Sequence, residues 1–104
     1  MNPALMTPPW NLRKCVKEML LLEEHLTDPE QQCPDCIWKH MLKAEAWLEE
    51  AATLDGRGEF SGVLRGADIK LRAIQETVKL GDLRTAAIAT RRLRKHLQPY
   101  VVGL

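Results

Sequence analysis

The chain has 104 residues, of which 45% are apolar, 28% charged and only 5% aromatic, and its formal net charge is +1. This length predicts a single domain with a modest hydrophobic core. The near-neutral charge disfavours bulk electrostatic attraction to nucleic acid, and no apolar run approaches the roughly 18 residues that a membrane span needs.

Residues 1–9 are expected to form an irregular arm, because Pro3, Pro8 and Pro9 disfavour both helix and sheet pairing. The start of the chain also lacks the charged-then-apolar order of a secretory signal. Residues 10–104 are expected to form one helical domain. Between Trp10 and Leu26, apolar side chains recur at steps of three and four residues, which predicts the first helix.

The second helix is expected to begin at Pro34, with Cys33 at its N-cap position, and to run to about Leu54. The preceding segment, residues 27–30, ends the first helix and allows one short turn before Pro34 interrupts it. Residues 55–58 contain two glycines beside an aspartate, which is typical of a turn.

Gly62 and Gly66 weaken the start of the third helix, so its firm part is placed near Leu64 to Leu80. Gly81–Asp82 predicts a compact joint, in which glycine adopts the left-handed conformation and aspartate caps the next helix. The fourth helix is expected from Leu83 to about Leu97. No segment alternates with period two, so the predicted fold class is all-α, an up-and-down bundle of about four helices or two helical hairpins.

Four potential metal ligands fall within sixteen residues: His25, Cys33, Cys36 and His40. Cys33 and Cys36 form a C-x2-C pair at a helix start, and His40 lies one helical turn beyond Cys36. An antiparallel return places His25, near the end of the first helix, beside the start of the second. The set predicts a tetrahedral Zn²⁺ site, which would clamp the first hairpin and be structural rather than catalytic.

Other interpretations of these residues remain open. All four could be ordinary structural side chains, and Cys15, too far along the helix to reach the same ion, is interpreted as a core residue. A C-x2-C pair at a helix N-terminus also suits dithiol redox chemistry, because the helix dipole favours the thiolate. Three cysteines do not make a disulfide framework, which indicates a cytoplasmic, reducing compartment.

The segment from Cys33 to His40 resembles the C-x2-C-x3-H motif of the alkylhydroperoxidase D-like family, which is all-helical. The resemblance implies a dithiol redox enzyme, a peroxidase or disulfide reductase, with Cys36 as the attacking thiol, Cys33 as the resolving thiol and His40 in a proton relay. It covers eight residues, and the family's upstream Glu is replaced here by Leu21.

A longer segment, residues 20–54, is similar to a stretch found in small uncharacterised helical proteins of phages and large DNA viruses, with the pattern His-x7-Cys-x2-Cys-x3-His. This resemblance implies no activity. It places His25 in one unit with the two cysteines, which favours metal binding over redox chemistry.

Charge is distributed unevenly along the chain. Residues 1–54 hold five basic and nine acidic side chains, whereas residues 55–104 hold ten and five. The last helix could contact nucleic acid through its cations, although attraction between the two hairpins explains them as well. These cations are Arg84, Arg91, Arg92, Arg94 and Lys95. A protein partner or self-association is favoured, with Trp38 as a candidate contact residue and Trp47 expected in the core.

Overall fold

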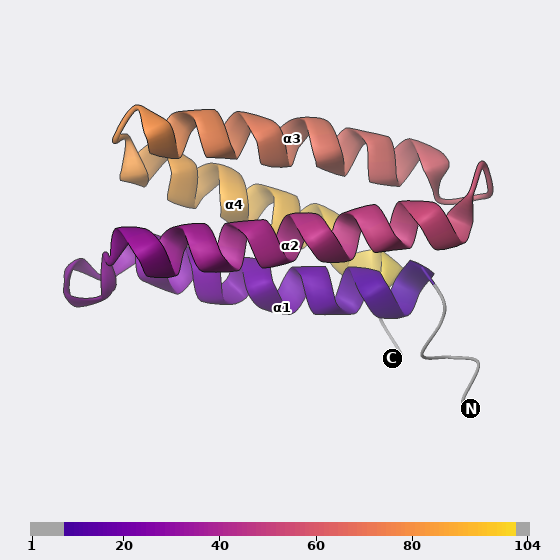
Figure 1. Cartoon of the computed structure of the whole chain (residues 1–104), viewed down its shortest axis with the longest axis horizontal. Coiled ribbons are helices and arrows are strands. Elements are labelled where there is room, and N and C mark those ends of the chain that lie inside the picture. The colour runs from indigo at the N-terminus through magenta and orange to yellow at the C-terminus, as the bar shows by residue number, and fades with distance from the viewer. Residues whose placement is uncertain (1–7, 102–104) are drawn as a thin grey trace.

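The computed structural model describes residues 8–101, and within that range it contains helices and turns but no strand. Four α-helices follow one another: α1 (Pro8–Thr27), α2 (Pro34–Asp55), α3 (Ser61–Lys79) and α4 (Leu83–Leu97). Two short 3-10 turns, η2 (Pro29–Gln31) and η3 (Gln98–Tyr100), follow α1 and α4. Successive helices run in opposite directions along the long axis (Figure 1). The predicted all-α up-and-down bundle is therefore confirmed.

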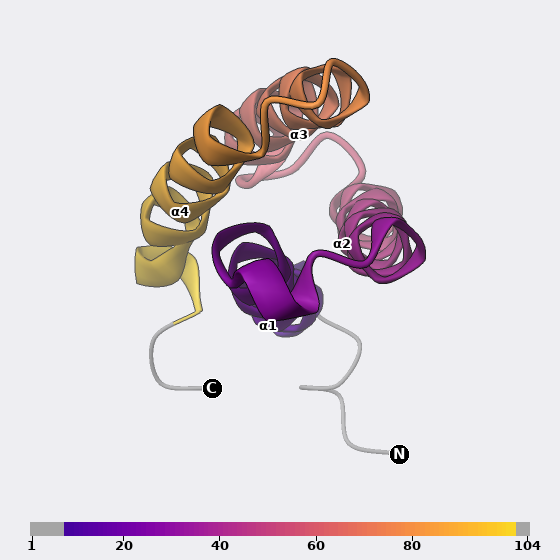
Figure 2. The same cartoon turned by 90° about the vertical axis from the view of Figure 1, so that its left-hand side faces the viewer.

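The bundle consists of two helical hairpins that share one core. Helix α1 packs against α2 and α4, and α3 packs against α4 and α2. Seen from one end, the α3/α4 hairpin covers one side of the α1/α2 hairpin (Figure 2). The core is built from the apolar positions that the helical periodicity predicts, which include Leu12, Leu22, Met41, Leu48, Leu71, Ile74, Leu93 and Leu97.

Two expected boundaries are wrong. Helix α1 begins at Pro8, so Pro8 and Pro9 belong to its first turn, where an amide donor has no helical partner to lose. Residues 1–7 of the expected arm lie outside the described range. Helix α3 begins at Ser61 rather than near Leu64, because burial of Leu64 and Ala67 outweighs the low helix propensity of Gly62.

The connections between helices are tight and locally encoded. Gly56 ends α2 with φ 63°, and Gly81 joins α3 to α4 with φ 80°, a region that favours glycine. Asp82 caps α4 by accepting a hydrogen bond from the backbone amide of Thr85 at 3.1 Å. The predicted joint at Gly81–Asp82 is thus confirmed.

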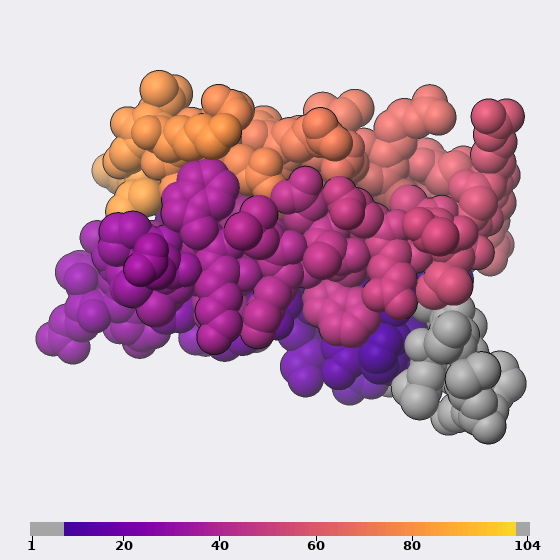
Figure 3. All heavy atoms as spheres, viewed as in Figure 1, coloured from indigo at the N-terminus to yellow at the C-terminus, as the bar shows by residue number. Residues whose placement is uncertain are grey.

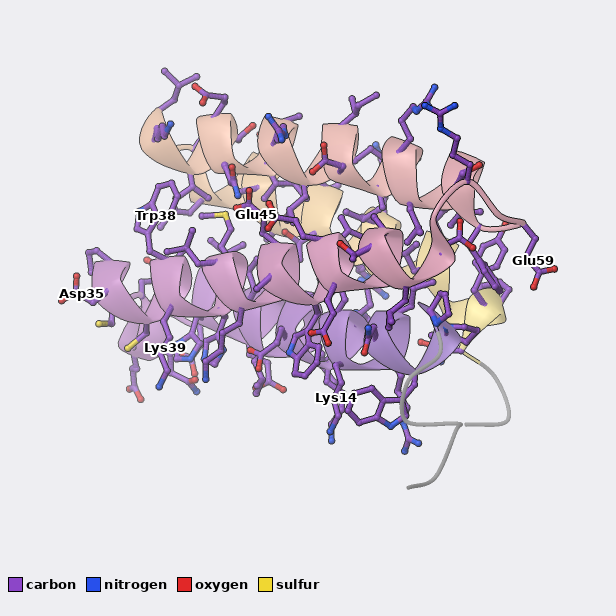
Figure 4. All side chains as sticks on the ribbon, turned by 45° about the vertical axis from the view of Figure 1, so that its right-hand side comes forward. Lys14, Asp35, Trp38, Lys39, Glu45 and Glu59 are labelled. Carbon is purple, nitrogen blue, oxygen red and sulfur yellow. The ribbon has the colours of Figure 1, made fainter. Side chains whose placement is uncertain are left out.

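Trp38 and Trp47 are partly buried side chains that pack against the edge of the core. Trp47, expected in the core, is only partly buried and lies edge-on to Trp10, with ring centroids 5.7 Å apart. Trp38 is also partly buried and points from α2 toward the α3 side of the bundle (Figure 4), where it packs against the core.

No helix within residues 8–101 is both long and apolar enough to cross a membrane.

Two leucines of α1 provide a test of the core. Leu22 is fully buried, whereas Leu20 is exposed. We expect Leu22→Ala to lower the free energy of unfolding by about 2–5 kcal/mol, because it removes buried methyl groups and leaves a cavity. Leu20→Ala is the matched control and should change it by less than about 0.5 kcal/mol. Chemical denaturation measures both, and equal losses would contradict this packing.

Candidate metal centre

The turn between α1 and α2 is closed by side-chain hydrogen bonds. Asp28 accepts from the backbone amide of Glu30 at 3.0 Å and from the side-chain amide of Gln31 at 2.9 Å. Gln32 donates its side-chain amide to the carbonyl oxygen of Leu26 at 3.0 Å, which ties the turn back to α1. These bonds place the end of α1 beside the start of α2, as the metal-site prediction requires.

The two histidines of this segment meet across the hairpin. The rings of His25 on α1 and His40 on α2 are stacked, with centroids 5.1 Å apart and planes 20° apart. The sequence separates them by fifteen positions, so only the chain reversal brings them together. This part of the predicted site is therefore assembled by the fold.

Each of these imidazoles has a polar partner at Nδ1. His25 Nδ1 lies 2.8 Å from the carbonyl oxygen of Gln31, and His40 Nδ1 lies 2.7 Å from Oε2 of Glu18. A carbonyl oxygen and an ionised carboxylate only accept hydrogen bonds, so each Nδ1 carries the proton and donates. Each neutral ring therefore has its lone pair on Nε2, the nitrogen that binds a metal in this tautomer.

The two cysteines form a second pair at the start of α2. The Sγ atom of Cys33 caps the helix and accepts a hydrogen bond from the backbone amide of Cys36 at 3.4 Å. The thiol of Cys36 also donates to Cys33, and together these bonds lower the pKa of Cys33 below its usual range. The same thiol contact, with desolvation, raises the pKa of Cys36. Cys33 is thus the more acidic thiol, and it is exposed.

Cys15 has the opposite character. It is fully buried in α1, and this burial, aided by the negative charge of Glu18, raises its pKa to about 12. A thiol of this kind stays protonated and inert near neutral pH. Its predicted place in the core is confirmed.

The structure gathers the four predicted ligands into two pairs rather than one cluster. Within residues 8–101, no group of three or more His, Cys, Asp or Glu side chains lies close enough together to hold a metal ion. The cysteine pair lies at the start of α2, where Figure 4 labels Asp35 and Lys39, and the histidine pair joins the end of α1 to α2. Joint coordination therefore requires the side chains to move from these positions.

Two polar partners at this site have no role in the sequence-based prediction. Glu18 precedes His25 by seven residues, which places both side chains on the same side of α1 two turns apart. This spacing could have indicated that Glu18 belongs to the site. Its carboxylate and the His40 ring are shielded from solvent, with exposed fractions of 17% and 14%. The sequence could not indicate the backbone carbonyl of Gln31 as a partner of His25, because every residue has a backbone carbonyl.

The cations of α4 divide into two kinds. Arg94 pairs with Glu23 of α1, with 2.9 Å between Nη2 and Oε2, and this contact holds the two hairpins together. The other four, Arg84, Arg91, Arg92 and Lys95, are exposed and form no ion pair with any residue of the described range. Attraction between the hairpins thus accounts for one of the five predicted cations.

No protein-family model, curated protein or solved structure matches the chain. The resemblances to the alkylhydroperoxidase D-like family and to phage and viral proteins therefore stay predictions.

The thiol pair makes a titration test possible in reduced, metal-free protein. We expect Cys36→Ala to raise the pKa of Cys33, because it removes the thiol donor that stabilises the Cys33 thiolate. The ultraviolet absorbance of the thiolate, followed against pH, reports this change, and burial raises the pKa of Cys15 to about 12, well above the range in which Cys33 titrates. Cys15→Ala is the control and should leave the Cys33 titration in place. An unchanged Cys33 pKa in Cys36→Ala would contradict the hydrogen-bonded pair.

Proposed function

We propose that the protein is a zinc-stabilised helical binding or assembly module, in which one Zn²⁺ is held by His25, Cys33, Cys36 and His40. Zinc binds thiolate sulfur and imidazole nitrogen in this combination. Four protein ligands leave no open position, so the ion would be structural and would join α1 to α2. Free thiolates of this kind persist in reducing surroundings, which supports a cytoplasmic location.

The tautomer of the two histidines carries this proposal. Metal-binding histidines almost always donate their other ring N–H to a carboxylate or a backbone carbonyl, which fixes the ring and raises its basicity. His40 has the first kind of partner in Glu18, and His25 has the second in Gln31. Both rings therefore present Nε2 for a metal while Nδ1 is held by a partner of the kind that metal-binding histidines use.

The thiols add support from their chemistry. Zinc binds the deprotonated sulfur, so a ligand whose pKa is already lowered gives up less free energy on binding. Cys33 meets this condition through its bonds to Cys36. Because its pKa is lowered, Cys33 would keep its zinc-binding thiolate form to a lower pH than an ordinary cysteine.

Metal analysis with histidine variants tests the proposal. We expect about one equivalent of zinc per chain, tetrahedral cobalt absorption with thiolate charge transfer after substitution by Co²⁺, and a large loss of affinity in His25→Ala. His96→Ala is the matched control, because His96 is exposed on α4, and it should bind zinc as the parent chain does. Metal-free protein, or equal binding by both variants, would overturn the proposed site.

Removal of the metal should also lower thermal stability. A ligand present at a thousandfold excess over its Kd stabilises the folded state by about 4 kcal/mol. We therefore expect a chelator to lower the Tm of the parent chain and of His96→Ala. The same chelator should leave the Tm of His25→Ala unchanged, since that variant has little metal to lose.

Glu18 offers a finer test of how the histidines are held. We expect Glu18→Gln to weaken zinc binding about 10–100-fold, because an amide cannot match the carboxylate as partner for His40 Nδ1. Glu24→Gln is the control, since Glu24 is exposed on the same helix and its carboxylate forms no hydrogen bond with either histidine. Competition with a zinc-sensitive dye measures both affinities. Equal affinities would remove Glu18 from the site.

A second function, dithiol redox chemistry, is favoured by one observation. Cys33 is an exposed thiol of lowered pKa beside a protonated partner, as a disulfide reductase requires. This order is the reverse of the roles that the alkylhydroperoxidase D-like resemblance implies, in which Cys36 attacks. Glu18 does supply His40 with the carboxylate that Leu21 cannot. A reversible Cys33–Cys36 disulfide in metal-free protein, with no zinc bound under any condition, would favour this function.

A further inference from the structure

The outer face of the α3/α4 hairpin is hollowed between the two helices. The hollow has a volume of about 290 Å³, and all of its lining residues belong to α3 or α4. Buried Ile74 and Leu93 form its floor, and Ala73, Ala89 and Ile88 form its walls. The small alanines create the depression, because a larger side chain at either position would fill it. The space suits one or two apolar side chains of another molecule.

The α3/α4 hairpin exposes three large aliphatic side chains, and one of them lines this hollow. Ile88 is 47% exposed at its wall, and Ile69 and Leu80 on the same hairpin are 63% and 85% exposed. Single exposed aliphatics are common, but an exposed isoleucine at the wall of an apolar hollow favours contact with another molecule. Helix α3 lies along the top edge of the molecule (Figure 3).

The rim of the hollow is positively charged. Lys70 of α3 and Arg92 of α4 line it from opposite helices, and neither forms an ion pair with a residue of the described range. Arg84, Arg91 and Lys95 extend this charge along α4. The charge disfavours a symmetric contact between two copies of this face, because cation would then meet cation.

We propose that this hollow is a docking site for an acidic amphipathic helix of a partner protein. The partner's apolar residues would enter the hollow, and its carboxylates would meet Lys70 and Arg92 across the rim. A helix is the fitting element, because a third helix laid between two antiparallel helices buries its apolar stripe in their groove. Nucleic acid would use the cations but leave the apolar floor uncovered, and no aromatic residue lines the hollow for base stacking.

Two designed peptides test the site on the full chain. Both carry the same leucine stripe at helical spacing, and their other positions are glutamate in one and lysine in the other. We expect the acidic peptide to bind and to shift the amide signals of Ala73, Thr85 and Ala89 in ¹⁵N–¹H spectra. Lys70→Glu combined with Arg92→Glu should reverse the preference, changing each affinity about tenfold or more in opposite directions.

A further variant separates the apolar contribution from the charge. Ile88→Ser should weaken binding of the acidic peptide, whereas Leu20→Ser, at an exposed leucine of α1, should not. Three results would overturn the proposal: shifts confined to α1 and α2, binding indifferent to Ile88→Ser, or a preference for single-stranded DNA or anionic vesicles over the acidic peptide. None of these readouts depends on which residues bind zinc, so the proposed metal site can fail while this site stands.

Discussion

The hydrogen bond between His40 and Glu18 is the contact on which the candidate site depends. It joins residues 22 positions apart, one on α2 and one on α1, and both side chains are largely shielded from water. A short hydrogen bond to a carboxylate in such surroundings is stronger than one exposed to solvent, and it holds the imidazole in one tautomer. The stacked ring of His25 then has a fixed neighbour rather than a rotating one. The turn that Asp28 closes makes this possible, because it sets the register of α2 against α1.

Much of the fold is readable from the sequence because its signals are local. Cys33 and Pro34 at the start of α2, and Gly81 and Asp82 before α4, act through the backbone geometry of one or two residues. The buried stripes follow from a period that depends only on the helix itself. The convergence of His25 with the start of α2 was also predictable, since a short turn between two helices leaves an antiparallel return as the only compact choice.

What the sequence could not provide is the identity of partners across a helix interface. Glu18 and Glu23 are both acidic residues of α1, yet one meets His40 and the other meets Arg94, and the rotation of α1 in the bundle decides which. The division of the four ligands into a stacked histidine pair and a hydrogen-bonded cysteine pair depends on side-chain rotamers, which no spacing rule fixes. The early start of α3 at Ser61 likewise reflects tertiary burial that overrides glycine propensity.

The two proposed sites occupy different hairpins, but they share one structural link. Glu23 lies two residues before His25 on α1, and Arg94 lies two residues after Arg92 on α4. Their ion pair, partly shielded at both ends, joins the two hairpins. The contact with Glu23 holds the Arg94 side chain against α1. Arg94 is thereby withheld from the outer face, and the charge offered to an acidic partner is that of Lys70, Arg92 and their exposed neighbours.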